Sequence, residues 1–132
     1  MTISTYDLGD LKLQSGEILP QAFISCETHG TLNSEKSNVI IYPTWYSGNH
    51  EDVQSAIGSD RALNPEKYFI VVPDMFGNGF SSSPSNTPPP YDRASFPAVT
   101  PYDNVLAQHR LITEKFSVTE VQLVVGFSMS AQ

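Results

Sequence analysis

Apolar side chains along the sequence gather in short runs, which polar or glycine- and proline-rich segments separate. The runs at residues 39–42 and 68–72 are continuous, and a third run at residues 121–125 is interrupted only by Gln122. Continuous apolar runs of this length are typical of strands that are covered on both faces of a sheet. We therefore expect these segments to form three covered, parallel strands.

The N-terminal segment is also predicted to be extended. Leu11 and Leu13 precede the polar turn at residues 14–17, and Ile18 follows it, which is the pattern of a β-hairpin. A further extended run covers residues 21–28. The sequence thus predicts an N-terminal hairpin ahead of a mostly parallel α/β sheet.

Only one segment has a clear helical pattern. Thr100 can cap its N-terminus, Pro101 suits the first helical position, and the side chain of Asp103 can reach back to the cap. The apolar positions that share a 3.6-residue period, and should face the core, are Tyr102, Val105, Leu106, Ile112 and Phe116. Since helices cover both faces of an α/β sheet, a single helix would leave one face bare, and we expect the architecture to be incomplete.

Residues 77–90 contain four prolines and four serines, a composition that predicts a long surface loop. The glycines at residues 77–79 do not form a dinucleotide-binding motif, because the third glycine and the following helix are missing. We interpret this short segment, together with Gly30 and Asn33, as turns.

Composition narrows the possible roles. The 132 residues suffice for one domain, residues 1–132, and 39% of them are hydrophobic, which can supply a buried core. Seven basic and 14 acidic side chains give a net charge of −7, so nucleic acids and membranes are poor partners. The single cysteine, Cys26, and an N-terminus without a signal-peptide pattern favour a cytoplasmic protein. No cluster of His, Cys and Asp has ligand spacing, so we expect no metal and no tightly bound cofactor.

The residues that carry chemistry lie at the end of the sequence. Directly after the last apolar run comes Gly126-Phe127-Ser128-Met129-Ser130, which resembles the Gly-x-Ser-x-Gly nucleophile elbow with serine in place of the second glycine. Such an elbow lifts the serine hydroxyl clear of the sheet, and the small flanking residues let strand and helix approach. The same five residues also fit a strand that ends in an ordinary polar turn.

A wider resemblance favours the elbow. The ordered blocks at residues 30–33, 39–48, 68–79, 96–100 and 124–129 are similar to homoserine O-acetyltransferase-like α/β-hydrolases, and the similarity runs from Leu11 to the end. It implies a serine-nucleophile acyltransferase or hydrolase that works through an acyl-enzyme. The substrates would be a small acyl donor, for which acyl-CoA is a candidate, and an alcohol or water as acceptor. Asp74 and residues 80–84 depart from the pattern of true homoserine transacetylases, which argues against homoserine as the acceptor.

The resemblance also implies roles for individual residues. Ser128 would be the nucleophile, and the backbone N–H of Met129 would be one donor of the oxyanion hole. The second donor would be the backbone N–H of Tyr46, with that of Trp45 as the next candidate. His50 follows this loop, and we expect it to contact the substrate.

The partners that activate such a serine are not found in the sequence. In this fold the order along the chain is Ser, then Asp or Glu, then His, whereas His29, His50 and His109 all precede Ser128. We therefore expect an N-terminal portion of a longer enzyme that is inactive by itself and lacks the lid, acid and histidine. The alternatives are an inactive remnant, or one half of a split enzyme that acts as an interaction module. Its partner would then be a second copy of the chain, in a homodimer, or a complementing C-terminal chain.

Overall fold

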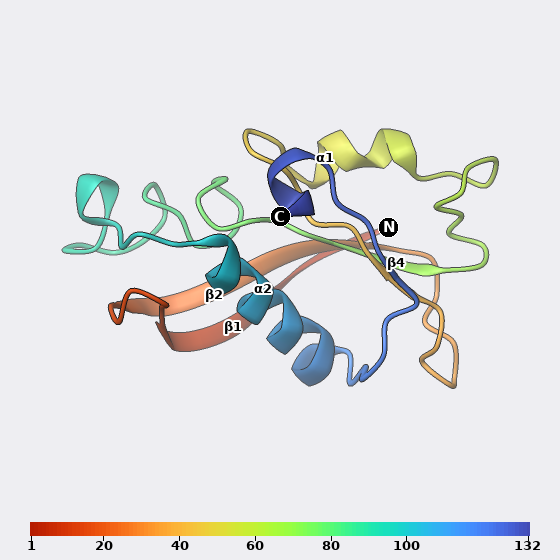
Figure 1. Ribbon diagram of the computed structural model, residues 1–132, viewed down its shortest axis with the longest axis horizontal. Helices are drawn as coiled ribbons and strands as arrows, with labels where there is room; N and C mark the ends of the chain where they lie inside the picture. The colour runs from red at the N-terminus through yellow and green to blue at the C-terminus, as the bar shows by residue number, and fades with distance from the viewer.

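A five-stranded sheet organises the chain in the computed structural model, which describes residues 1–132 (Figure 1). In chain order the strands are β1 (Thr2–Lys12), β2 (Ile18–His29), β3 (Val39–Ile41), β4 (Phe69–Pro73) and β5 (Leu123–Val124). Their order in the sheet is β1-β2-β4-β3-β5, with β3 parallel to both β4 and β5. The hairpin of β1 and β2 joins the sheet through antiparallel pairing of β2 with β4. The predicted hairpin and the mostly parallel strands that follow it are confirmed.

The hairpin is longer than its sequence pattern indicated. The N–H of Leu13 donates to the carbonyl of Glu17 at 2.9 Å, and the N–H of Gly16 donates to the carbonyl of Leu13 at 2.9 Å, which closes the predicted turn. Beyond the turn, Ile18 and the extended run at residues 21–28 belong to one continuous strand, β2. The register of the hairpin shifts around Gly9, which lies opposite Ala22.

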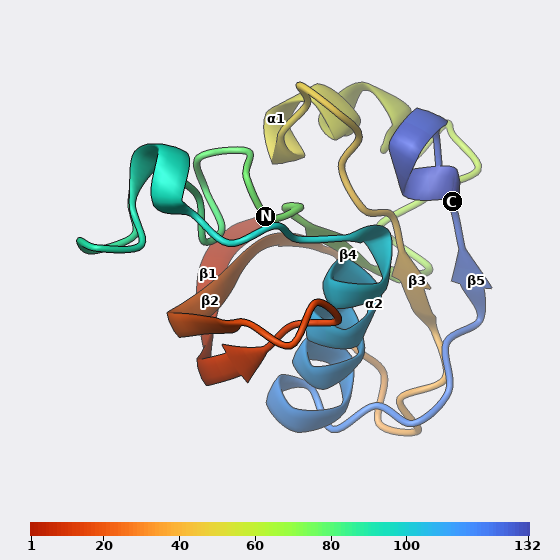
Figure 2. The ribbon, with the colours of Figure 1, turned by 60° about the vertical axis from the view of Figure 1, so that its left-hand side comes forward.

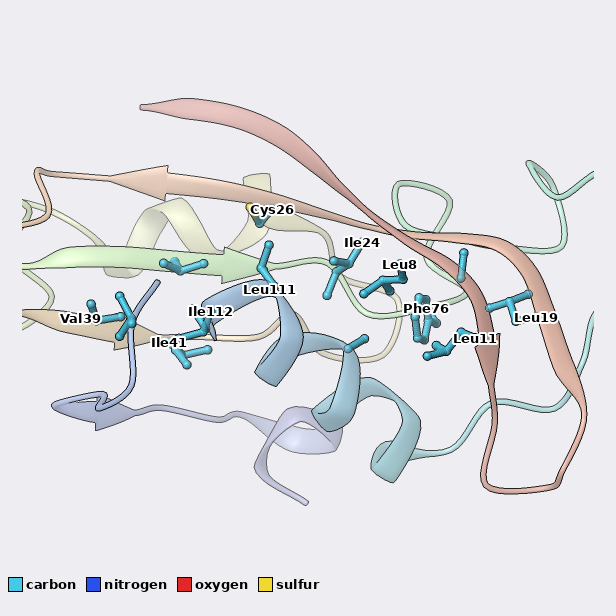
Figure 3. Packing of buried hydrophobic residues seen from close by; sticks show 14 of the residues in the cluster. Leu8, Leu11, Leu19, Ile24, Cys26, Val39, Ile41, Phe76, Leu111 and Ile112 are labelled. Carbon is cyan, nitrogen blue, oxygen red and sulfur yellow. The ribbon is translucent and has the colours of Figure 1, made fainter. Parts of the chain in front are cut away.

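One face of the sheet is covered by α2 (Pro101–Arg110), as Figure 2 shows. The helix continues as a π-helical segment, Leu111–Lys115. Figure 3 shows how side chains from the hairpin, from β3 and from this helix fill the space between them. The main core cluster has 16 buried residues, and its members include Leu8, Leu11, Leu19, Ile24, Val39, Val71, Ala107, Leu111 and Ile112. No helix of the structure combines the length and the apolar character that a membrane crossing requires.

The other face of the central strands is also covered, which corrects the expectation of a bare face. The short helix α1 (His50–Val53) and a 3₁₀ turn (Gln54–Ala56) lie on this side. A second cluster of buried side chains forms there from Ile40, Val53, Leu63, Ile70 and Val72. A helix of only four residues is too short to produce a recognisable 3.6-residue period, so the sequence pattern did not indicate it.

The predicted apolar face of the helical segment is confirmed at its end, where Ile112 is buried and Phe116 packs against the main core, but not in its first turns. Tyr102 and Val105 are each 59% exposed, whereas Asp103 and Asn104 are buried. Their carboxylate and amide groups are buried because they serve the backbone of neighbouring segments. Oδ1 of Asp103 accepts from the N–H of Gln14 at 2.7 Å, and Oδ1 of Asn104 accepts from the N–H of Phe76 at 2.8 Å. The predicted cap is confirmed, because Thr100 and Asp103 form a reciprocal capping box.

Residues 81–83, at the centre of the predicted surface loop, are buried instead. The hydroxyl groups of Ser81 and Ser82 complete the hydrogen bonding of β2 where β4 has ended. The N–H groups of Phe23 and Ser25 donate to Oγ of Ser82 and Oγ of Ser81, each at 2.9 Å. Serine is small and can bond the backbone, so a run of it can lie against a strand edge without forming a strand itself.

The last strand, β5, was predicted to be covered on both faces, but it is exposed. Leu123 and Val124 are 47% and 59% exposed, and β5 lies at the edge of the sheet. A hollow of about 480 Å³ separates β5 from α2, with Val105 and Ile112 on the helix side and Val121 and Val124 on the strand side.

Burial and hydrogen bonding shift the pKa of particular side chains in the framework. Burial raises the pKa of the Cys26 thiol, so Cys26 packs as a small apolar side chain. Tyr6 on β1 donates to Glu114, which also pairs with Arg110 at the end of α2. This hydrogen bond raises the pKa of Tyr6, and Arg110 lowers the pKa of Glu114. The side chains of Tyr6, Glu114 and Arg110 thus link β1 to the C-terminal end of the helix.

Leu111 is fully buried in the main core, and its replacement tests this packing. Leu111→Ala is expected to lower the free energy of unfolding by about 2–5 kcal/mol, because it removes buried methyl groups and leaves a cavity. The same substitution at Leu123, which is 47% exposed, should change it by less than about 0.5 kcal/mol. Urea unfolding of both variants measures the difference. Equal losses at the two sites would contradict the described core.

Candidate active site

Ser128 lies on a sharp turn just beyond the edge strand β5. Phe127 is extended, with φ −130° and ψ 135°, whereas Ser128 has φ +54° and begins a 3₁₀ turn, Ser128–Ala131. A positive φ is uncommon for a residue with a side chain, and it costs about 1–3 kcal/mol unless the surroundings hold it. The serine is exposed. This is the backbone geometry that a nucleophile elbow requires.

The residues on either side of Ser128 make this turn possible. A Cβ atom on Gly126 would lie 2.4 Å from the carbonyl oxygen of Ser130 and 2.7 Å from Cα of Ala131, so only glycine leaves room there. The hydroxyl of Ser130 donates to the carbonyl oxygen of Phe127 and accepts from its N–H, each at 2.9 Å. Serine at the position of the second elbow glycine therefore closes the turn with its own side chain.

The loop after β3 lies against this turn. The ring of Trp45 packs edge-on against that of Phe127, with 5.6 Å between the ring centroids. The N–H of Gly48 donates to the carbonyl of Trp45 at 3.0 Å, and Ser47 within this tight turn has φ +64°. A Cβ atom on Gly48 would lie 2.7 Å from Nε1 of Trp45, so glycine lets the indole lie close to the loop.

A cleft of about 440 Å³ opens between these segments. Its walls are the loop after β3, the loop after β4 and the turn after β5, which contribute Trp45, Tyr46, Ser47, Gly48, Asn49, Met75, Phe76, Gly77, Asn78 and Met129. The structure therefore brings all three residues proposed as oxyanion donors to one cleft. Ser128 is not among the lining residues, but it directly precedes Met129, which is one of them.

The loop after β4 is a wall that the sequence analysis missed. The sequence pattern predicts only turns for residues 77–79 and assigns no role to Met75 or Phe76. The signal was present, because these residues directly follow a buried parallel strand. The carboxyl ends of parallel strands meet at one edge of a sheet, and ligands bind there in α/β folds.

His50 does not occupy the predicted position. It is 1% exposed and does not line the cleft, so the expected contact with a substrate does not fit the structure. Its Nδ1 lies 2.7 Å from Oδ2 of Asp74, and its ring packs edge-on against Phe80 with 4.8 Å between centroids. His50 begins α1, and its backbone N–H donates to Oδ1 of Asp74, just after β4. This bond places the imidazole beside Asp74 rather than in the cleft.

The other histidines also lie outside the cleft. His29 bonds the buried carboxylate of Glu27, and His109 is exposed on α2 beside the hollow next to β5. No group of three or more His, Cys, Asp or Glu side chains in the structure could hold a metal ion. The lining of the cleft offers backbone N–H groups together with the polar side chains of Tyr46, Ser47, Asn49 and Asn78, and the hydroxyl group of Ser128 lies one residue before Met129.

Comparison with known proteins yields relatives that are much longer than this chain. It is 45% identical over 127 residues to an ethyl acetate hydrolase of Pseudomonas veronii, covering 96% of this chain and 36% of the relative. It is 33% identical over 144 residues to a homoserine O-acetyltransferase of Sulfurimonas autotrophica, covering 97% of this chain and 39% of the relative. No family model matches the sequence.

Solved structures agree with the sequence relatives. An acetylester hydrolase from Corynebacterium glutamicum superposes with a TM-score of 0.95 at 44% identity, over 98% of this chain and 38% of that protein. The chain thus spans less than two fifths of the length of the relatives it matches. In sequence and in fold, it matches the N-terminal portion of the homoserine O-acetyltransferase-like α/β-hydrolases, a group that includes both esterases and acetyltransferases.

Proposed function

We propose that this chain carries the nucleophile and the oxyanion hole of a serine-dependent ester hydrolase. The observation that carries the proposal is the left-handed backbone of Ser128, at φ +54°, on a turn beside the cleft. Three other features support it: the glycine-only position 126, the loop after β3 and the 45% identity to an ethyl acetate hydrolase.

In the first half of the reaction, Oγ of Ser128 attacks the acyl carbon of a small ester. The hydroxyl proton passes to a general base, and the carbonyl oxygen becomes a tetrahedral oxyanion. Collapse of this intermediate breaks the bond to the leaving alcohol, which takes up a proton, and leaves an acyl group on Ser128. In the second half, water attacks the acyl carbon, and the acid and the free serine are released. The base and its orienting acid are not assigned to residues of this chain.

The oxyanion hole would be formed by backbone N–H groups of two loops. Met129 follows the nucleophile directly, and its N–H is the donor that elbow chemistry supplies. The loop after β3 offers the second donor, for which we propose Tyr46. Tyr46 is 76% exposed and lines the cleft, and the turn at Ser47 and Gly48 fixes the backbone that follows it. Removing one such donor typically costs a factor of about 10²–10³ in kcat.

Transfer of the acyl group to an alcohol is the second candidate function. It is favoured by the 33% identity to a homoserine O-acetyltransferase, and the chemistry differs only in whether water or an alcohol accepts the acyl group. Asp74 and residues 80–84, which depart from the pattern of homoserine transacetylases, and the higher identity to ester hydrolases favour water. Neither reaction requires a metal or a bound cofactor.

Rapid-mixing kinetics on the protein expressed from its complete natural gene test this proposal. With p-nitrophenyl acetate, we expect a burst of one p-nitrophenolate per protein molecule, followed by slower steady-state release. With an alcohol added, acetate should remain the main product of a hydrolase, whereas the acetyl ester of that alcohol should replace it if the protein is a transferase. Release without a burst that is equally fast from heat-denatured protein would favour an inactive remnant or an interaction module.

A further inference from the structure

Asp74 directly follows β4, and its carboxylate is fully buried. Oδ1 accepts from the backbone N–H of His50 at 3.0 Å and from Nδ2 of Asn78 at 2.9 Å, and Oδ2 lies 2.7 Å from Nδ1 of His50. Both oxygens are therefore bonded, and the partners come from two separate segments of chain. One of these segments follows the loop after β3, and the other belongs to the loop after β4.

These bonds join the two loops that form the walls of the cleft. Nδ2 of Asn78 also donates to the carbonyl oxygen of Gly48 at 3.4 Å, in the loop that would supply the oxyanion donor. The N–H of Met75, which also lies in the loop after β4, donates to Oγ1 of the buried Thr44 at 3.0 Å. The loop containing Trp45 and Tyr46 is thus held at both of its ends to the residues that follow β4.

The imidazole of His50 is fixed from several directions. Nε2 lies 4.0 Å from Oε2 of Glu27, a fully buried carboxylate that is itself held by His29 and by Nε2 of Gln54 at 2.9 Å. Phe80 packs against the imidazole ring. Because the ring cannot turn freely, it transmits the position of Asp74 to the beginning of α1 and to the loop that precedes it.

We propose that Asp74 is a positioning residue for the oxyanion hole, and that it acts through His50 and Asn78. This inference rests on the proposed function of the cleft. Asp74 touches no reacting atom, and its carboxylate instead fixes the distance between the loop after β3 and the rest of the site. Preorganised donors stabilise a developing oxyanion only when they already stand in place.

Steady-state ester hydrolysis by the protein expressed from its complete natural gene tests this role. Asp74→Asn keeps the shape of the side chain, but the NH₂ group that replaces Oδ2 cannot accept from Nδ1 of His50. The remaining oxygen is also uncharged, so it binds the N–H of His50 and the amide of Asn78 more weakly. We expect kcat to fall by about 10- to 100-fold, with KM within about twofold, because a small misplacement of catalytic donors has effects of this size. Asn78→Ala, at a partly exposed side chain, should lower kcat in the same direction. Asn33→Ala, which removes an amide from an exposed turn, should leave both constants unchanged.

Hydrogen exchange provides a readout that does not depend on activity. In Asp74→Asn and Asn78→Ala, amides of residues 45–49 should exchange faster while those of β1 and β2 keep their protection. Unchanged exchange in this loop, or a normal kcat in both variants of an enzyme that depends on Ser128, would overturn the inference and leave the proposed function standing. Activity that is independent of Ser128 would instead remove the proposed function, and the exchange result would then decide whether Asp74 holds the loop. If Asp74→Asn does not fold, Asn78→Ala carries both measurements.

Discussion

Replacement of Ser128 by alanine is expected to lower kcat for ester hydrolysis by about 10⁴- to 10⁶-fold in the protein expressed from its complete natural gene. The variant loses the hydroxyl group that would form the acyl-enzyme, while the cleft and the backbone donors remain. The p-nitrophenolate burst should disappear with it. Alanine at a left-handed position is also mildly strained, so the circular dichroism spectrum and unfolding midpoint of the variant should be recorded beside its activity.

A second serine provides the matched control for this variant. Ser34 is exposed in the turn between β2 and β3, and Ser34→Ala should leave the burst and kcat unchanged. If Ser128→Ala retained the burst with a normal unfolding midpoint, the serine would not be the nucleophile, and the turn after β5 would be only structural.

Gly126→Ala is expected to have the second largest effect, a loss of about 10²-fold in kcat. Its new Cβ would lie 2.4 Å from the carbonyl oxygen of Ser130 and 2.8 Å from the backbone N of Ala131, and backbone atoms cannot turn aside as a flexible side chain can. The turn must therefore open, which moves Ser128 and the N–H of Met129. The elbow is exposed, so the unfolding midpoint should change little.

Gly58→Ala is the control for this substitution. Gly58 also lacks a positive φ, but the nearest atoms to a Cβ there are Oδ1 of Asp60 at 3.0 Å and Cγ of Arg61 at 3.3 Å, both in side chains that can move. We expect normal activity from this variant. Equal activity of the variants at Gly126 and Gly58 would show that the close approach at the elbow is not needed for the reaction.

Local patterns were sufficient to predict the elements that local forces specify. The turn of the hairpin, the capping box at Thr100 and the unbroken apolar run of β4 were all predicted from neighbouring residues and are present in the structure. The orientation of α2 was not, because Asp103 and Asn104 are buried through hydrogen bonds to segments far away in the chain. A hydrophobic period registers apolar side chains only, so it cannot anticipate a helix that buries satisfied polar groups.

In the candidate site, too, some residues could be predicted from the sequence and others come together only in the folded chain. Gly126 and Ser128 were indicated by their spacing after an apolar run, and the loop after β3 by the order of the blocks it shares with a family. The wall formed by Met75 and Asn78, and the pairing of His50 with Asp74, arise only when β3 and β4 lie side by side. His50 was therefore expected in the cleft, although its neighbours in space place it beneath the loop.

The central claim is that Ser128 is the residue that accepts the acyl group. Its most direct test treats the protein from the complete natural gene with an organophosphate ester, which phosphorylates activated serines irreversibly, until hydrolysis of p-nitrophenyl acetate stops. Digestion and mass spectrometry then locate the adduct. We predict one phosphoryl group per molecule, on the peptide that contains Ser128. Complete loss of activity with Ser128 unmodified and another residue labelled would contradict the account.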